Sequence, residues 1–218
     1  MMKFFRNNSL SIIFLVLFIF SFLGQILFGI KDYNKENAEY GKPPVSVMVY
    51  LKSGHFLEAT FENWESEFLQ MGLFVWLTIF LKQKGSSESK KFDGSDEVDK
   101  EPDQFKPFAP WAVRKGGMIL KFYKHSLTIC LFALFFASLI LHFYGSYKEE
   151  NFTNFLKHKP SVKIAEYISD SKFWFESFQN WQSEFLSVFA IIILSIFLRQ
   201  KGSPQSKPVD SPNSETGE

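Results

Sequence analysis

Two carboxylates in matching surroundings are the residues of this sequence that are best placed to do chemistry. Glu67 ends the segment Asn63-Trp64-Glu65-Ser66-Glu67, Glu184 ends the segment Asn180-Trp181-Gln182-Ser183-Glu184, and an apolar run follows each. A carboxylate at the edge of an apolar run is stable only when it is paired, hydrated or protonated. The pair therefore suggests binding of a cation or relay of a proton inside a membrane.

Further polar residues share the helical face of each carboxylate. At about 100° per residue, Thr60 and Asn63 fall beside Glu67, and Ser177 and Asn180 fall beside Glu184. This set is the candidate ion-binding stripe: Thr60, Asn63, Glu67, Ser177, Asn180 and Glu184. Gln25 and His142 align near the outer ends of two other apolar runs and would complete a cavity. A hydrogen bond between helices, or simple placement at the lipid interface, explains Gln25 and His142 better.

A structural interpretation of the same stripe competes with transport, and we favour it. In that interpretation both carboxylates lie in hydrated headgroups beside the interfacial anchors Trp64 and Trp181. Three more acids share another face of the helix that contains Glu67, but the matching positions before Glu184 are apolar or neutral. Because the charge is not kept, we assign this face to the outer side of the helix, away from its helix contacts. The acids are Glu58, Glu62 and Glu65, and their counterparts are Phe175, Gln179 and Gln182.

Four apolar runs predict an all-α integral membrane protein. Residues 10–30 and 127–147 match the roughly 20 residues that cross a ~30 Å hydrocarbon core. Two shorter runs must recruit upstream neighbours, which gives spans at about 62–82 and 179–199. Ser53 and Asp170 are typical N-cap residues, so we expect one helix from about Gly54 to Lys82 and a matching helix after Asp170.

The two halves of the chain repeat each other at a shift of about 117 residues. About 16 of 28 positions from Asn63 to Lys90 are identical after this shift. The pattern predicts a tandem duplication of a two-helix hairpin with a pseudo-twofold axis along the membrane normal. Residues 1–85 and 116–202 are the repeats. Residues 86–115 form a polar, disordered linker whose aromatic end includes the interfacial anchor Trp111, and residues 203–218 form a disordered tail.

Composition and motifs exclude several classes of function. The net charge of +1 gives no basic field for nucleic acid, and the single cysteine, Cys130, excludes a Cys-rich metal site. The histidines lack metal-ligand spacing, and no phosphate loop or nucleophile motif is present. We therefore expect no enzyme, no catalytic residue, no cofactor and no metal. Lys and Arg concentrate in the N-terminus, linker and tail, which predicts cytoplasmic termini.

The repeated segment Asn-Trp-x-Ser-Glu-Phe-Leu, followed by an apolar run and Gln-Lys-Gly-Ser-x-x-Ser-Lys, resembles an uncharacterised family of bacterial four-span membrane proteins. This resemblance implies a bacterial inner-membrane location and brings no activity or ligand. We expect a non-enzymatic structural or accessory component. Its partners would be the lipid bilayer and a second copy or another membrane protein. The alternative is a small cation- or proton-coupled transporter or channel that uses Glu67 and Glu184.

Overall fold

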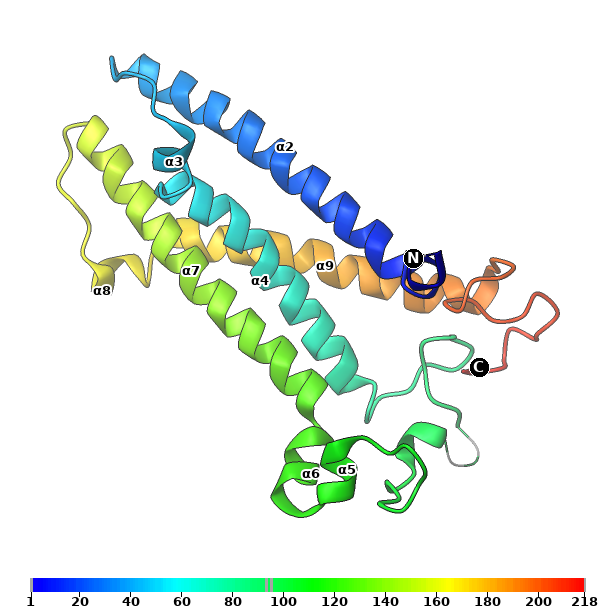
Figure 1. Cartoon of the computed structure of the whole chain (residues 1–218). Helices are drawn as coiled ribbons and strands as arrows, with labels where there is room; N and C mark the ends of the chain where they lie inside the picture. The colour runs from blue at the N-terminus through cyan, green and yellow to red at the C-terminus, as the bar shows by residue number, and fades with distance from the viewer. Residues whose placement is uncertain (1, 93, 95, 218) are drawn as a thin grey trace. The chain divides into compact units, whose positions relative to one another are not determined.

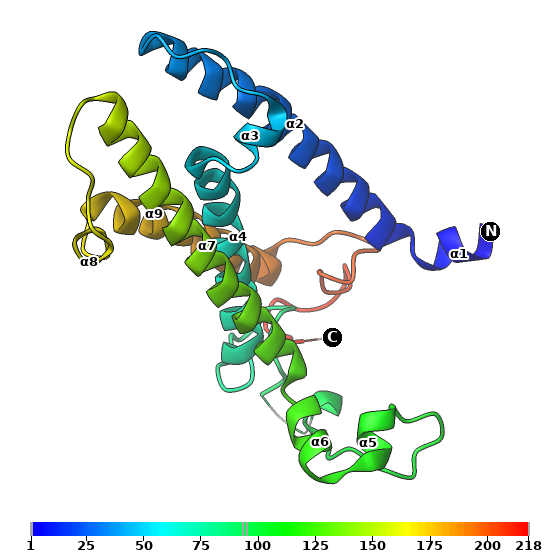
Figure 2. The same cartoon turned by 60° about the vertical axis from the view of Figure 1, so that its left-hand side comes forward.

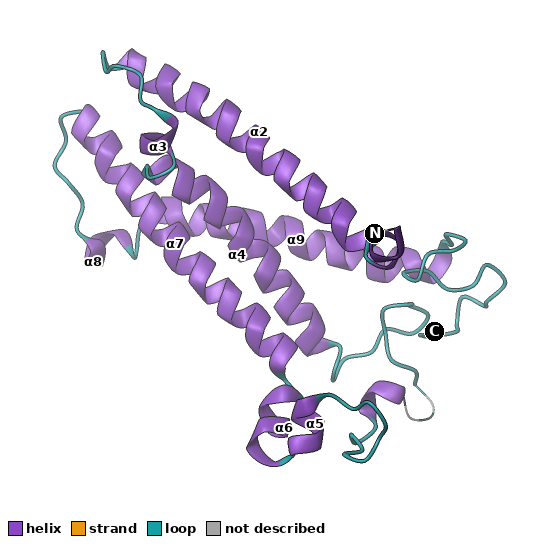
Figure 3. Cartoon of the chain, viewed as in Figure 1, coloured by secondary structure: helices purple, strands orange, loops and turns teal. Residues whose placement is uncertain are grey.

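The chain is all-helical over the residues that the computed structural model describes, which are 2–92, 94 and 96–217 (Figures 1 and 3). Residues 1, 93, 95 and 218 lie outside the described residues, and so do the parts of the predicted first repeat, linker and tail that fall on them. The all-α class is confirmed. The helices are α1 (Met2–Asn7), α2 (Ser9–Glu39), α3 (Val47–Tyr50), α4 (Gly54–Leu77), α5 (Trp111–Lys115), α6 (Gly117–Tyr123), α7 (Ser126–Leu156), α8 (Ile164–Tyr167) and α9 (Ser171–Phe197), with a 3-10 turn at Glu97–Asp99.

Three of the described helices are long and apolar enough to cross a membrane, namely α2, α7 and α9. They contain or overlap the predicted spans at 10–30, 127–147 and 179–199. At 1.5 Å per residue they are about 40–46 Å long, which exceeds a hydrocarbon core of ~30 Å. The chain is therefore a membrane protein.

Helix α4 ends earlier than the sequence predicts. It begins at Gly54, where the Ser53 hydroxyl accepts a hydrogen bond from the amide of Phe56 at 3.1 Å. It ends at Leu77 and not near Lys82. The Thr78 hydroxyl and amide both donate to the carbonyl of Phe74, at 2.8 and 3.1 Å, and the amides of Ile79 and Phe80 then bond to carbonyls only three residues back, which ends the α-helical pattern. The N-cap of α9 follows the prediction, because the Asp170 carboxylate accepts from the amide of Lys172 at 2.7 Å.

The described residues form two compact units, which we treat separately. Unit 1 contains the residues up to Phe61 together with Ile140–Phe173, and unit 2 contains Glu62–Leu139 together with the residues from Trp174 onward. The boundaries fall inside α4, α7 and α9.

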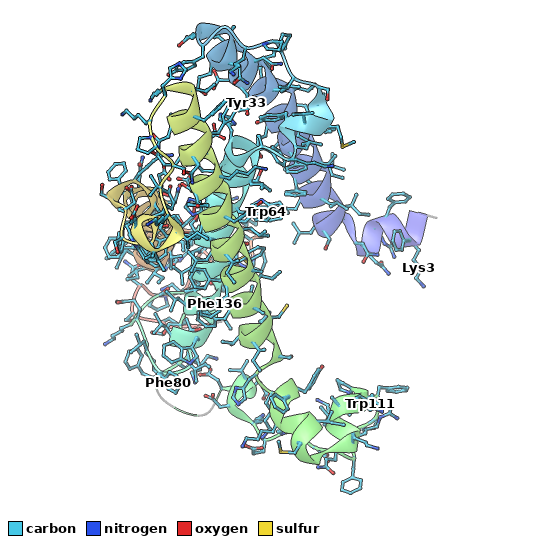
Figure 4. All side chains as sticks on the ribbon, turned by 90° about the vertical axis from the view of Figure 1, so that its left-hand side faces the viewer. Lys3, Tyr33, Trp64, Phe80, Trp111 and Phe136 are labelled. Atoms are coloured by element: carbon cyan, nitrogen blue, oxygen red, sulfur yellow. The ribbon has the colours of Figure 1, made fainter. Side chains whose placement is uncertain are left out.

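The core of unit 1 is aromatic. Tyr33 of α2, Tyr50 of α3 and Phe56 of α4 are buried together, and Figure 4 labels Tyr33 among them. The ring centroids of Tyr33 and Tyr50 are 5.6 Å apart, and those of Tyr50 and Phe56 are 5.4 Å apart. These tilted and edge-to-face contacts are the favourable arrangements for aromatic rings. They hold α2, α3 and the first turn of α4 together.

Glycines allow the backbones of α4 and α7 to approach closely in unit 1. A Cβ atom at Gly54 would lie 2.4 Å from the amide nitrogen of Glu149, and a Cβ atom at Gly145 would lie 2.4 Å from the amide nitrogen of Glu58. Neither distance leaves room for a methyl group beside a backbone atom. Small residues at such crossings are typical of membrane helices, where close packing drives association.

Unit 1 also contains the same backbone clamp twice, at positions 117 residues apart in the sequence. The Asn34 side chain accepts from the amide of Val45 at 2.7 Å and donates to its carbonyl at 3.3 Å. The Asn151 side chain makes the same pair of bonds with Val162, at 2.8 and 3.4 Å. Each asparagine satisfies both polar groups of one residue in the connection that follows its helix, which fixes the path of that connection.

In unit 2 the two Gln-Lys-Gly-Ser-x-x-Ser-Lys segments form matching turns. The Ser89 hydroxyl accepts from the amide of Gln83 and the Ser206 hydroxyl accepts from the amide of Gln200, both at 2.9 Å. The final lysine of each segment then reaches the residues that follow. Lys90 forms an ion pair with Asp99 at 2.9 Å, and the Lys207 ammonium donates to the carbonyls of Pro212, Asn213 and Glu215.

The glycine crossing gives a direct prediction. Gly145→Ala and Gly54→Ala should each lower the free energy of unfolding by about 1–3 kcal/mol, because the added methyl overpacks a backbone contact. Thermal unfolding of the detergent-purified protein measures the effect. Gly24→Ala is the matched control, because Gly24 also lies in a helix and a Cβ there meets nothing within 4 Å. Equal stability of all three variants would contradict the close crossing.

Candidate functional site

Thr60 and Gln25, two of the predicted site residues, form a hydrogen bond in unit 1. Thr60 on α4 is buried, and its hydroxyl accepts from the Gln25 amide of α2 at 3.0 Å. His142, the counterpart of Gln25, is fully buried on α7, and its ring centroid lies 4.9 Å from that of Phe173. The contact between Gln25 and Thr60 is the hydrogen bond between helices that the sequence favours over a cavity.

The other members of the predicted stripe belong to unit 2. Asn63 and Glu67 are exposed on α4, whereas on α9 Ser177 is fully buried and Asn180 and Glu184 are partly buried. The carboxylates of Glu67 and Glu184 lie within electrostatic range of each other. The structure therefore brings the two repeated acids near each other.

Two acids that the sequence assigns to the outer face, the fully buried Glu65 and the partly buried Glu62, contact α9 in unit 2. Glu65 of α4 is fully buried, and its carboxylate accepts from the indole N–H of Trp181 at 3.0 Å. The Glu62 carboxylate accepts from the side-chain amide of Asn180. The outward assignment of these acids is therefore wrong.

The sequence does contain a signal for this acidic contact face. The regular spacing of Glu58, Glu62 and Glu65 along one face of α4 is a real pattern. The loss of these acids in the second copy is the reason for the outward assignment. The same loss is expected for a contact face if the two copies have different partners there.

In unit 1, Glu58 continues this face and receives two further donors. The Lys172 ammonium lies 2.9 Å from the Glu58 carboxylate, and the Ser146 hydroxyl donates to the same oxygen at 3.0 Å. Tyr167 lies 2.6 Å from the Ser146 hydroxyl. Because the single hydroxyl proton of Ser146 is directed at Glu58, the Tyr167 hydroxyl must be the donor to Ser146. The result is a chain of hydrogen bonds from α8 through α7 to α4.

A second carboxylate in unit 1 caps α4 from another helix. Glu149 of α7 accepts from the amide of His55, in the first turn of α4, at 2.6 Å. An anion at a helix N-terminus satisfies an amide that has no partner inside the helix and interacts favourably with the helix dipole. Beside it lies Tyr50, which is almost fully buried. Burial raises the pKa of the Tyr50 hydroxyl, and the charges of Asp32 and Glu149 raise it further.

The three predicted anchor tryptophans have different surroundings. Trp181 is partly buried, donates to Glu65 and packs against the rings of Phe135 and Phe178. Trp64 is also partly buried, on α4. Trp111 begins α5 and is 64% exposed, and Figure 4 labels it there; α5 packs against α6 (Figure 2). Trp111 alone among the three has the wide exposure that an interfacial residue needs.

Most polar contacts of this region are made by carboxylates that accept from amide, hydroxyl, indole and ammonium groups, and the Gln25–Thr60 and Tyr167–Ser146 hydrogen bonds are the other two. Among the described residues there is no group of three or more His, Cys, Asp or Glu side chains that could hold a metal ion. Chemically, the arrangement can link helices, and the proximity of Glu67 and Glu184 adds a place where a cation or proton could be shared.

Comparison with known proteins places the chain in a family. No curated protein and no solved structure matches the chain. One family profile matches all of it, residues 1–218, and that family is described as a domain of unknown function. The chain, whose described residues are all-helical and include three helices long and apolar enough to span a membrane, therefore belongs to the family named Domain of unknown function (DUF6766).

Proposed function

We propose that this protein is a non-enzymatic structural or accessory component of the bacterial inner membrane. It crosses the membrane four times, as a tandem duplication of a two-helix hairpin with cytoplasmic termini, and it associates with a second copy or with another membrane protein. The observation that carries the proposal is the hydrogen bond from Trp181 to the fully buried Glu65. It uses polar side chains of the two repeated segments to join α4 and α9.

Paired local structures support the duplication. The asparagine clamps at Val45 and Val162, and the serine turns at Gln83 and Gln200, occur at positions that the shift of about 117 residues relates. Independent sequences would have to converge on both features at the same spacing. A copied hairpin accounts for both together.

The geometry of α4 supports a fourth span. Its 24 residues extend about 36 Å, enough to cross a hydrocarbon core of ~30 Å. Its charged half contains Glu58, Glu62 and Glu65, and each of these carboxylates accepts a hydrogen bond from another helix or its cap region. Partnered acids are tolerated in a membrane helix far better than unpartnered ones.

The surface of α2 supports association with lipid or protein. The most apolar stretch of this helix has no fully buried residue, and most of its Leu, Ile and Phe side chains are exposed, although Phe22 and Ile26 pack in part against the aromatic core. An apolar surface of this size needs lipid or a protein partner around it. This fits an accessory protein whose role depends on what it contacts in the membrane.

A double-mutant cycle tests the structural role of the bond between Trp181 and Glu65. Trp181→Phe removes a donor from a buried carboxylate and should destabilise the protein, and Glu65→Gln in the same chain should restore part of the loss because no charge is then buried. We expect a coupling energy of about 0.6–1.7 kcal/mol from thermal unfolding in detergent.

The matched control for the cycle is Trp111→Phe, at an exposed tryptophan of α5. This change should stay within about 0.5 kcal/mol of wild type. If Trp181→Phe behaved like Trp111→Phe, and no coupling to Glu65 appeared, the polar contacts would not hold the helices together and the structural proposal would fail.

Transport is the second candidate, because the structure brings the carboxylates of Glu67 and Glu184 within electrostatic range. Two acids that share one region of a membrane protein can bind a cation or share a proton. Four spans are few for a secondary transporter, so this function would need an oligomer.

Water accessibility separates the two functions without a known substrate. Single cysteines at Glu67, Glu184, Asn63 and Asn180, in a Cys130→Ser background, are treated with a membrane-impermeant thiol reagent on intact cells. If the structural role is a dry polar contact between helices, all four stripe positions are protected, while control cysteines in the connections that follow α2 and α7 are labelled. Labelling at Glu67 and Glu184, with protection at neighbouring Phe68 and Phe185, would indicate a hydrated cavity and favour transport.

Liposome flux gives the complementary test. Under the structural proposal, proteoliposomes show no proton or monovalent-cation flux above protein-free liposomes, and Glu67→Gln and Glu184→Gln change nothing. A wild-type flux that either substitution abolishes would overturn the proposal in favour of transport. Glu101→Gln, at a carboxylate that is 87% exposed, is the charge-matched control.

A further inference from the structure

Unit 2 contains an elongated groove between the end of α4 and the second half of α9. Its volume is about 750 Å³, within the range of roughly 300–1,000 Å³ typical of small-molecule sites. The walls are mostly apolar and come from both helices; they include Leu73, Phe74, Leu77, Phe185, Phe189 and Ile192.

The size of the apolar part suits a hydrocarbon chain. The lining stretch Gln70–Leu77 covers about 10 Å of α4, and Phe185–Ile193 covers about 12 Å of α9. In a membrane protein, a long apolar groove between two apolar helices is filled most favourably by an acyl chain, because acyl chains surround the protein at high concentration and gain dispersion contacts with aromatic and branched walls.

The mouth of the groove is polar and carries one charge of each sign. Lys82 and Glu88 line it, together with Gln83, Ser86 and Ser89. The segment that supplies them follows α4 (teal in Figure 3) and is held in place locally. Ser89 accepts from the amide of Gln83 at 2.9 Å, and the Ser86 hydroxyl lies 3.1 Å from that of Ser195 on α9.

Lys82 is positioned within this mouth by two further contacts. Its ammonium donates to the carbonyl of Lys91 and lies 5.6 Å from the centroid of the Phe92 ring. An ammonium group has three donors, so Lys82 can keep the Lys91 bond and still donate to a phosphate oxygen. The cation is thus placed at the end of the groove where a headgroup would lie.

From this arrangement we infer that the groove binds one glycerophospholipid whose headgroup carries both a phosphate and a primary ammonium, the phosphatidylethanolamine class. One acyl chain occupies the apolar groove, the phosphate accepts from Lys82, and the headgroup ammonium donates to the Glu88 carboxylate. A choline headgroup has no N–H to donate to Glu88. A glycerol headgroup leaves the lipid with a net negative charge beside Glu88.

This inference rests on the membrane location of the protein and not on its structural role. The test is native mass spectrometry of the full chain in detergent, titrated with phosphatidylethanolamine, phosphatidylcholine and phosphatidylglycerol that have identical acyl chains. We expect the ethanolamine lipid to bind about tenfold more tightly than the choline lipid, which corresponds to about 1.4 kcal/mol. Equal binding of the three lipids, or preference for the glycerol lipid, would overturn the proposal.

Two substitutions separate the two ends of the headgroup. Lys82→Ala should weaken all three lipids about tenfold because each carries a phosphate. Glu88→Gln should remove the preference for ethanolamine over choline, because it weakens the ethanolamine lipid, which loses a charge-assisted hydrogen bond, more than the choline lipid, which loses only an electrostatic attraction. Lys100→Ala and Glu97→Gln, in an exposed ion pair that does not line the groove, are the matched controls and should change neither value.

A third variant tests the acyl-chain site itself. Ile192→Trp fills the apolar groove from α9 and should reduce retention of the ethanolamine lipid at least tenfold, while circular dichroism verifies that the helices are intact. Unchanged retention in a folded Ile192→Trp variant would show that the lipid binds elsewhere and would contradict the proposal. These readouts are independent of the Trp181–Glu65 cycle and of ion flux, so a failure here leaves the proposed function standing.

Discussion

A carboxylate removed from water must find hydrogen-bond donors, and the arrangement of α4 depends on this constraint. Burial of an unpaired carboxylate costs several kcal/mol. This cost is far larger than the stability that one hydrogen bond adds when the carboxylate stays in water. Glu65 is fully buried and accepts from Trp181, Glu62 accepts from Asn180, and Glu58 accepts from Lys172 and Ser146. Rotation of α4 about its axis would break these bonds together. The acidic face therefore fixes which side of the helix turns inward.

Close backbone approach makes the contacts of unit 1 possible. The methyl group that alanine would add at Gly145 would meet the amide of Glu58, and the one added at Gly54 would meet the amide of Glu149. At the same crossing, Ser146 reaches Glu58 and Glu149 caps the first turn of α4. A wider separation would exceed hydrogen-bond distance for both groups. The polar contacts between α4 and α7 therefore depend on the close approach that the two glycines allow.

The proposed duplication explains which positions the two copies share. Asn34 and Asn151, like Ser89 and Ser206, have partners within their own copy, so the same residue serves in each. Glu65 pairs instead with Trp181 of the other copy. If both copies kept an acid on a shared contact face, carboxylates would be brought together and would repel. This repulsion explains why the acids of the α4 contact face are replaced by neutral or apolar residues on α9.

Local chemistry determined what the sequence predicts well: the all-α class, the apolar helices α2, α7 and α9, and the caps at Ser53 and Asp170. These features depend on residues within a few turns of one another. The tertiary structure decided which polar residues of α4 are buried. Glu65 is fully buried and Glu62 is partly buried, whereas Asn63 and Glu67 of the predicted stripe are exposed, and α4 ends at Leu77. Helical periodicity assigns residues to faces, but only packing against another helix decides which face is buried, because donors distant in sequence set that choice.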